Sequence, residues 1–355
     1  DENLHYGTHQ RWQSQFNWFL NYDQQFGKHG VSAMAVFEAA EDGKDWVEAR
    51  AYAPIANIDQ FFVYSSDEDN RTGYAYESMG GRMSWIGRLN YNYADKYIAE
   101  FSFRYDGNDK FAKGNRWGFF PGVSAGWVGS EEEFYAPLAD VVNYAKVRAS
   151  YGVNGSIDGN YIGIYTLHGK YGRSTTYNTN VGYTLATLPN PNLRWEKTRT
   201  AEVGFDLGFL NNKYTVGITY YNRVTQDKYA SLTFPSTTGY SGVTNNNGEF
   251  RNRGIEIDVN ANLLNSKDFT WTLSGNISYN KNTVLKLPYN GVENNRQGGT
   301  QIYTGNGNEK YYVGGLQEGQ TPYNVMVGFL TDKMVRSTAD LVDGYADISQ
   351  SVAVY

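Results

Sequence analysis

The chain has 355 residues and no cysteine, which excludes disulfide bonds and thiolate metal sites. Its net charge of −6 is spread along the sequence rather than gathered into a basic patch, so nothing indicates nucleic acid as a partner. No run approaches 18 apolar residues, and a transmembrane helix is therefore excluded.

The composition is compatible with a β-barrel in a membrane. A mean hydropathy of −0.59 would usually indicate a soluble protein, but the lipid face of a barrel uses only every second residue of each strand. The 31 tyrosines and 8 tryptophans suit membrane interfaces, where one end of the ring is apolar and the other is wet.

Ten segments alternate polar and apolar residues, which is the period of a β-strand with one wet and one apolar face. In chain order the predicted strands are 11–26, 31–41, 81–94, 96–106, 116–128, 143–153, 194–210, 213–225, 249–264 and 268–282. Most are longer than the strands of a globular sheet and long enough to cross a bilayer.

The clearest alternation lies in 253–264. Apolar side chains occupy Ile255, Ile257, Val259, Ala261 and Leu263, while charged or amide residues stand between them. The same rule predicts that the apolar residues of 201–209 lie opposite those of 214–220. The other face carries residues such as Arg88, Glu100, Arg104, Glu202, Asp206 and Arg223. A wet, charged interior predicts a wide lumen, because a small solid core would bury those charges unpaired.

Short and long connections alternate along the chain. Tight polar turns are predicted at 27–30, 94–96, 211–212 and 265–267, and long loops at 42–80, 107–115, 154–193, 226–248 and from 283 onward. Outer-membrane barrels have short periplasmic turns and long extracellular loops, so this rhythm also orients the chain. Segment 129–142 is the exception, where Ser130 and Glu133 predict a capping box and a short periplasmic helical turn.

The alternative folds are a soluble β-sandwich or β-helix. Strand length and the alternation of short and long loops argue against both, and the absence of a self-similar period of 20–50 residues argues against a solenoid.

Four stretches carry a family resemblance. Residues 104–134 contain Arg-Tyr-Asp-Gly-Asn, Arg-Trp-Gly-Phe-Phe-Pro, Ser-Ala-Gly-Trp and Ser-Glu-Glu in order. Lys-Val-Arg-Ala-Ser-Tyr-Gly follows at 146–152, Leu-Pro-Asn-Pro-Asn-Leu-Arg-Trp-Glu-Lys-Thr at 188–198 and Arg-Gly-Ile-Glu at 253–256. Together they resemble the SusC/RagA family of TonB-dependent outer-membrane transporters of Bacteroidetes. The resemblance implies an all-β transmembrane antiparallel barrel of roughly 22 strands, of which this chain would supply a middle-to-late part.

The sequence departs from that family in several places. We find no plug domain, TonB box or closing C-terminal strands, so residues 1–355 are expected to form part of one barrel domain. After Tyr151-Gly152 the family often has Gly-Asn-Gln, where this chain has Gly-Ser-Ile-Asp-Gly-Asn at 155–160. From about residue 320 the match fades and no strand is predicted.

No catalytic constellation is found, so an enzyme is not expected. His5, His9, His29 and His168 lack metal-ligand spacing. The Glu131–Glu133 run is better explained as a solvated turn than as acid–base machinery. No cofactor is expected. Ca²⁺ binding at Asp67–Asn70 or Asp106–Asp109 stays open, although ordinary turn chemistry explains both clusters.

The long loops are the expected site of function, because binding residues concentrate on loops held by a rigid scaffold. Aromatic rings among amides and hydroxyls can stack on sugar rings and hydrogen-bond their hydroxyls; the alternative is that they pack loop against loop. The candidate substrate-facing aromatics are Trp46, Tyr64, Tyr74, Tyr76, Phe111, Tyr161, Tyr165, Tyr171, Tyr177 and Tyr240.

By resemblance, the leading hypothesis is TonB-dependent nutrient import across the bacterial outer membrane. A SusD-like surface lipoprotein would cap the mouth, and TonB-ExbB-ExbD would act through the plug region. The barrel wall itself would contact outer-membrane lipid. Oligosaccharides are the commonest cargo of the family and peptides a minority. The competing hypotheses are an adhesive or structural barrel without transport and an outer-membrane barrel enzyme.

Overall fold

The computed structural model describes residues 3–52, 71–163, 166–177, 180–240, 242–304, 309–322, 333–334 and 353–354. Ten strands form one antiparallel sheet in the order β1-β2-β3-β4-β5-β6-β9-β10-β11-β12. They are β1 (Asn3–Phe26), β2 (His29–Tyr52), β3 (Arg71–Tyr93), β4 (Tyr97–Asn108), β5 (Trp117–Val128), β6 (Val142–Ser156), β9 (Glu196–Phe209), β10 (Tyr214–Thr233), β11 (Gly242–Asn265) and β12 (Thr270–Lys286).

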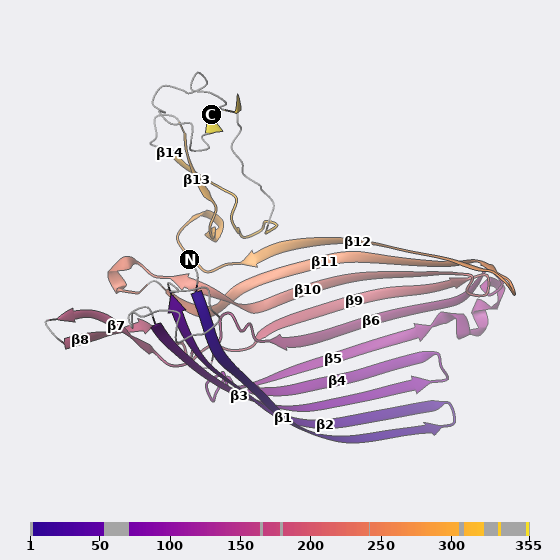
Figure 1. The fold of residues 1–355 in the computed structure, drawn as a ribbon. Coiled ribbons are helices and arrows are strands. Elements are labelled where there is room, and N and C mark those ends of the chain that lie inside the picture. Colours follow the sequence, from indigo (N-terminus) through magenta and orange to yellow (C-terminus); the bar gives the residue numbers. More distant parts are fainter. Residues whose placement is uncertain are drawn as a thin grey trace.

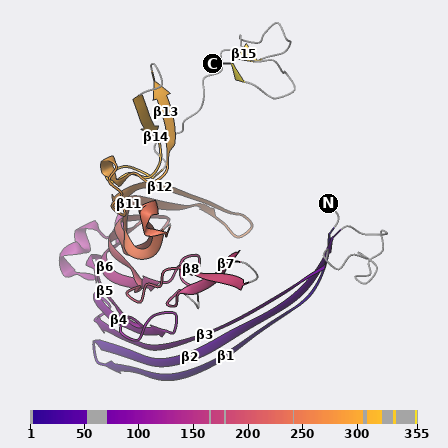
Figure 2. The same cartoon turned by 90° about the vertical axis from the view of Figure 1, so that its left-hand side faces the viewer.

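The sheet is a curved meander. Neighbours in sequence are neighbours in space throughout, except that β6 pairs with β9 across the β7–β8 hairpin. Seen along the strands, the sheet bends into an open trough with a concave and a convex side (Figure 2). The two edges, β1 and β12, are not joined to each other. No helix among the described residues is long and apolar enough to cross a membrane.

All ten predicted strands are present, and the predicted pairing of the central hairpin is confirmed. Tyr214 lies opposite Phe209, Val216 opposite Leu207 and Ile218 opposite Phe205. The predicted tight turns also occur, and three of them use left-handed backbone conformations, at Gly27, at Ala94–Asp95 and at 210–212. A hydrogen bond from Ala94 N to Lys28 O (2.7 Å) links two neighbouring turns, and Asn262 N of β11 donates to Lys213 O in the turn before β10 (2.8 Å).

Several strands are longer than predicted, and the long loops are correspondingly shorter. The loop predicted at 42–80 is wrong at both ends, because β2 continues to Tyr52 and β3 begins at Arg71. The loop predicted at 226–248 shrinks to 234–241. Beyond the bilayer both faces of a strand meet water, so the alternation that marks the membrane-crossing part of a strand disappears while its backbone pairing continues.

The predicted outward face is confirmed as a continuous exposed apolar surface. Trp85, Leu89, Phe101, Tyr151, Val203, Ile277 and Tyr279 are all exposed. One residue of the prediction is wrong: a bulge between Asn262 and Leu264 brings Leu264, rather than Leu263, onto this face opposite Trp271. Large apolar side chains that face no protein across the whole outer side of a sheet are what a lipid-facing wall requires.

The connection between β5 and β6 is helical, as predicted, but it has no capping box. It contains the 3-10 helices η3 (Gly129–Glu131) and η4 (Glu133–Leu138), and neither has a side-chain hydrogen bond at its N-cap. Ser130 Oγ is buried without a hydrogen-bond partner among the described residues. Pro137 lies within η4.

Smaller elements lie at the end of the sheet that carries the long loops. The segment predicted as the loop 154–193 contains a hairpin of β7 (Lys170–Tyr177) and β8 (Asn180–Thr187). Helix η5 (Ser236–Thr238) follows β10, and η6 (Glu293–Asn295) follows β12. Strands β13 (Thr300–Thr304) and β14 (Glu309–Val313) pair with each other, as do β15 (Lys333–Met334) and β16 (Ala353–Val354). Figure 1 shows β7 and β8 at the end of the sheet opposite the short turns.

Candidate functional site: the inner wall and its mouth

The inner face of the sheet carries arginines that are paired with carboxylates. The pairs are Arg82–Glu38 (3.5 Å), Arg88–Glu100 (3.9 Å), Arg104–Asp106 (3.0 Å), Arg148–Asp206 (3.2 Å) and Arg223–Glu202 (4.0 Å). Arg148 also donates to Thr219 Oγ1 at 2.6 Å. Each cation therefore has its own anion, so these ten residues line the lumen with strong polarity and no net charge.

Glycines open a hollow in the middle of this charged wall. Strand β5 turns large side chains outward, such as Phe119 and Val123, and turns Gly118, Gly122 and Gly126 inward. Of these, Gly122 forms part of the floor of a hollow of about 680 Å³, together with Gly152 and Gly155 of β6. Arg88, Glu100, Arg104, Asp106, Glu202 and Arg223 surround it. The wall can therefore accommodate a polar solute, or another polar segment of protein, in this hollow.

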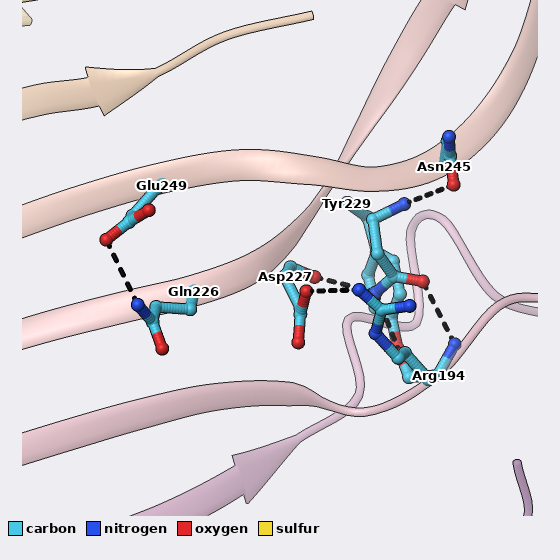
Figure 3. A network of polar contacts seen from close by, with 7 residues as sticks. Arg194, Gln226, Asp227, Tyr229, Asn245 and Glu249 are labelled. Carbon is cyan, nitrogen blue, oxygen red and sulfur yellow. Dashed lines mark hydrogen bonds and ion pairs between the residues drawn. The ribbon is translucent and has the colours of Figure 1, made fainter.

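A polar clamp holds the segment before β9 at the base of the mouth (Figure 3). Arg194 Nη2 contacts Asp227 Oδ1 at 2.7 Å, and the carbonyl oxygen of Arg194 accepts hydrogen bonds from Tyr229 OH and Asn246 Nδ2, both at 2.8 Å. Asp227 lies at a bulge of β10 in a left-handed conformation, which turns its carboxylate toward Arg194. The segment 188–198, noted for its family resemblance, thus fixes three strands at one point.

Behind the clamp lies a small hydrophobic core. It consists of Phe111, Phe120, Ile162, Leu193, Trp195 and Tyr229. The Phe111 and Trp195 ring centroids are 5.3 Å apart, and Trp195 Nε1 donates to the carbonyl oxygen of Arg116 at 3.1 Å. The prediction that Phe111 faces a substrate is therefore wrong, because its side chain is 0% exposed and packs the loop against the wall.

Three of the candidate aromatics lie together, on strands rather than on the predicted loop. Trp46 of β2 lies directly opposite Tyr76 of β3, and its ring meets Tyr74 edge-on at 5.7 Å. His9 of β1 approaches Trp46 from the other side, with ring centroids 4.4 Å apart. By strand parity these rings are on the face that carries Glu38 and Arg82, which is the inner face. We call Trp46, Tyr74 and Tyr76 the aromatic platform.

The platform borders a polar hollow of about 320 Å³. Tyr76 forms part of its wall, together with Asp42, Ser78, Asn108, Asp109 and Lys110. Tyr74 and Tyr76 are 51% and 43% exposed, so both rings remain accessible to a solute. Trp46 Nε1 is shielded from water and has no hydrogen-bond partner among the described residues. Exposed rings beside carboxylate, amide and hydroxyl groups are the usual make-up of a site for a polar organic ligand.

A second aromatic surface lies on the β7–β8 hairpin. Tyr171 and Tyr183 are 73% and 68% exposed, and Arg173 lies directly opposite Tyr183. Because residues two apart on a strand share a face, Tyr171, Arg173, Tyr183 and Leu185 lie on the same side. Figure 2 places the hairpin on the concave side of the sheet. Tyr183 and Arg173 were missed, although the alternation of Val181, Tyr183 and Leu185 is a strand signal that could have revealed them.

The remaining candidate aromatics are dispersed. Tyr161 is 38% exposed at the edge of the hydrophobic core, where its ring lies 6.2 Å from that of Tyr229. Tyr240 is half-buried beside η5, and Tyr177 belongs to β7. Tyr64 and Tyr165 lie outside the described residues. Among the candidates that the structure describes, it therefore brings together Trp46, Tyr74 and Tyr76 and leaves the rest apart.

Metal-binding geometry is absent from the part of the chain that the structure describes, which holds no group of three or more His, Asp or Glu residues able to bind a metal ion. His5 instead contacts Glu48 Oε1 at 2.7 Å, and His29 contacts Tyr91 OH at 2.8 Å. In the 106–109 cluster, Asn108 Oδ1 accepts a hydrogen bond from Lys110 N at 3.0 Å, which is ordinary turn chemistry, and Asp109 Oδ2 accepts one from Gly81 N of β3 at 2.8 Å. The other candidate cluster, 67–70, lies outside the described residues.

An apolar outer face, a polar inner face, short turns at one end and an elaborated mouth at the other define part of a transmembrane barrel of the bacterial outer membrane. Comparison with known proteins identifies the family. The model of the family described as "TonB dependent receptor-like, beta-barrel" matches residues 1–346, and the chain belongs to this family.

The relatives extend this identification. The chain is 32% identical over 292 residues to the TonB-dependent receptor SusC of Bacteroides thetaiotaomicron, covering 79% of this chain and 28% of SusC. It is 31% identical over 282 residues to the TonB-dependent receptor P39 of Formosa agariphila, covering 76% of this chain and 26% of P39. The chain thus spans about a quarter of the length of these relatives.

Solved structures agree on the fold. A structure of the RagAB peptide transporter matches with a TM-score of 0.71 at 20% identity, covering 88% of this chain and 33% of that one. The RagAB peptide importer in its closed-closed state matches with a TM-score of 0.72, also at 20% identity and with the same coverage. The predicted SusC/RagA-type barrel is therefore confirmed.

Proposed function

We propose that the receptor containing this chain imports a polar nutrient across the outer membrane, and that its cargo is an oligosaccharide. Membership of the TonB-dependent receptor family supports import. The inner wall supports a polar, uncharged cargo, because the arginines around the glycine-floored hollow are paired with carboxylates. A net field of one sign would instead favour an ion of the opposite sign.

The aromatic platform is the observation that carries the choice of an oligosaccharide. Sugar rings have apolar C–H faces that stack on aromatic rings and hydroxyls that need donors and acceptors at their edges. Trp46, Tyr74 and Tyr76 supply the rings, while Asp42 and Asn108 in the adjoining hollow supply oxygens and an amide. An oxygen of the cargo that reached Trp46 Nε1–H would also satisfy that buried donor, whose isolation costs about 1–3 kcal/mol.

Energy coupling and capture would come from outside this chain. The proposal includes TonB-ExbB-ExbD acting through a plug region and a SusD-like lipoprotein over the mouth. The family and the kinship to SusC support both partners. The hairpin of Tyr171 and Tyr183 would contact cargo on its way from the mouth to the platform.

Peptide import is the second candidate, and the hairpin favours it. Arg173 is exposed and lies beside two exposed tyrosines, an arrangement that suits a peptide carboxylate flanked by side chains. The structures that match this fold include one described as a peptide importer. The two candidates place their main contacts on different surfaces, which makes them separable.

Uptake assays with paired variants test the proposal. Trp46→Ala in the full receptor should weaken uptake of an oligosaccharide about tenfold, which corresponds to the loss of roughly 1.4 kcal/mol of binding. Tyr289→Ala is the matched control, because Tyr289 is 78% exposed, follows β12 and lines neither of the two hollows. Oligosaccharide uptake that persists in Trp46→Ala, together with peptide uptake lost in Arg173→Ala, would replace the first candidate by the second.

The partners are tested by purification from native outer membranes in mild detergent. Co-purification of a SusD-like lipoprotein, and uptake that stops when TonB is deleted, are the expected results. A receptor recovered alone, with glycan binding but no TonB-dependent uptake, would favour an adhesive barrel and refute import.

A further inference from the structure

The turn between β5 and β6 carries exposed apolar side chains at the end of the wall where the short turns lie. Phe134, Leu138 and Val141 are 67%, 56% and 59% exposed. Solvated turns normally present small and polar residues, and each of the other short turns of this sheet exposes at most one large apolar side chain, such as Leu210 or Phe269. A cluster of three large apolar groups on one turn therefore requires a partner that covers them.

The position of this turn identifies the side from which the partner comes. The ring of Phe134 lies 6.3 Å from that of Trp127, measured between centroids. Trp127 belongs to the exposed outward series of β5, together with Phe119 and Val123. Figure 2 shows the helical turn on the convex side of the sheet, away from the trough. The apolar groups of the turn thus continue the lipid-facing surface of the wall.

The turn is held firmly against the strand ends. The Glu132 carboxylate accepts hydrogen bonds from Tyr97 OH at 2.6 Å, from Trp127 Nε1 at 3.3 Å and from Lys96 Nζ at 3.3 Å. Backbone hydrogen bonds join Leu210 N to the carbonyl of Val141 at 3.0 Å and Val128 N to the carbonyl of Lys96 at 2.8 Å. The apolar groups are therefore presented in a fixed direction.

We propose that the segment 129–141 is an interfacial anchor that inserts Phe134, Leu138 and Val141 into the periplasmic leaflet of the outer membrane. Its ring contact with Trp127 makes it continuous with the lipid-facing wall, which argues for lipid rather than a periplasmic protein as the partner. Short turns lie on the periplasmic side of such barrels, which assigns the leaflet. The inference depends on the placement of the barrel in the outer membrane and not on the cargo.

The charges of the segment specify the lipid. Glu131, Glu133 and Asp140 are exposed beside the apolar groups, so an anionic headgroup layer would repel the anchor. Insertion driven by apolar burial into a zwitterionic leaflet fits this combination better than a polybasic type of membrane attachment.

Site-directed spin labelling tests the anchor in the full receptor reconstituted in phosphatidylcholine nanodiscs. The absence of cysteine from this chain favours single-cysteine labels. A nitroxide on Leu138→Cys should collide more often with lipid-soluble oxygen than with a water-soluble nickel chelate. A nitroxide on Glu133→Cys, an exposed position five residues away on the same turn, should show the reverse.

Two outcomes would overturn the proposal. Labels at both positions that collide mainly with the nickel chelate would place the turn in water. A label at Leu138→Cys shielded from both reagents would place it under protein. A second variant guards against a label that disturbs the turn: Phe134→Ser with Leu138→Ser should make a label at Ala139→Cys several-fold more accessible to the chelate, and unchanged access would also refute insertion.

Discussion

Removing the hydroxyl of Tyr229 tests how the clamp at the mouth is held. In Tyr229→Phe the buried ring stays in the hydrophobic core, and the hydrogen bond from Tyr229 OH to the carbonyl oxygen of Arg194 is lost. That carbonyl still accepts a hydrogen bond from Asn246 Nδ2 at 2.8 Å, so it is not left without a partner. The expected cost is therefore the net value of one hydrogen bond, about 1 kcal/mol, rather than the larger penalty of an isolated polar group.

Asn246→Ala provides the contrast. The Asn246 side chain donates to the carbonyls of Arg194 (2.8 Å) and Asp227 (2.6 Å), and its Oδ1 accepts from Arg194 N at 2.9 Å. Alanine removes all three contacts, and the Arg194 N–H and the Asp227 carbonyl lose these partners. Because water can reach part of this region, the expected cost is about 2 kcal/mol, below the sum for fully buried groups.

Native-state hydrogen exchange of the receptor in detergent measures both costs as local opening free energies. Peptides covering 188–196 and 226–248 should exchange about fivefold faster in Tyr229→Phe and about 30-fold faster in Asn246→Ala, since about 1.4 kcal/mol corresponds to a factor of ten. Peptides from the turn at 266–269 serve as an internal reference, because the clamp does not reach them.

The order of the two variants is the decisive result. Equal acceleration in both, or greater acceleration in Tyr229→Phe, would mean that the Arg194 carbonyl does not share its two donors as described. Acceleration below twofold in both variants would mean that the hydrophobic core, and not the polar clamp, holds the segment.

Three further predictions concern the inner floor, the outer face and the periplasmic turn. Gly155→Ala should destabilise the receptor by about 1–3 kcal/mol in guanidinium unfolding, because the new Cβ would overlap the ring of Phe120. Adding Phe120→Leu to the same chain should recover part of the lost stability. If it recovers none, the overlap is not the cause. Val203→Arg, on the lipid face, should lower the free energy of unfolding by about 2–4 kcal/mol if the residue lies near the bilayer midplane. Glu202→Gln, on the inner face, should lower it by less than about 1 kcal/mol. Equal losses of stability in reconstituted vesicles would refute the assignment of faces. Hydrogen bonds from Tyr97 and then Trp127 lower the pKa of Glu132 below its ordinary 4.5, so the stability it adds to the turn is present above that value and is lost as the pH falls through the lowered pKa. Exchange of 129–141, corrected for intrinsic rates, should therefore accelerate only below about pH 4.5, and Glu132→Gln should remove that acid-dependent step.

The membrane-crossing part of the wall could be predicted from the sequence because its pattern is local. In 253–264 every second residue must be apolar to face lipid, and its neighbours must be polar to face the lumen. The same constraint on β9 and β10 fixed the pairing of Val216 with Leu207 and of Ile218 with Phe205. A slip of one residue would have turned each strand inside out, so the pattern left a single register.

Above the membrane this constraint disappears, and the sequence alone gave the wrong boundaries. Trp46, Tyr74 and Tyr76 were assigned to a loop because both faces of their strands are wet, yet backbone pairing continues from Ala51–Arg71 down to the turn. The capping box at Ser130 failed for a related reason, since tertiary hydrogen bonds to Glu132 determine the shape of that turn.

The sequence by itself determined that the chain forms a β-barrel wall, which face of the wall is apolar, at which end the short turns lie and which family the chain resembles. Each of these can be read from residues that are close together in the sequence. Only the tertiary structure decided which aromatic residues are accessible. Phe111 and Tyr76 are both aromatic and both near the mouth, but Phe111 is enclosed by Trp195 and its neighbours while Tyr76 borders a hollow. The exposure of an aromatic side chain depends on contacts with residues far apart in the chain, and a local sequence pattern does not show these contacts.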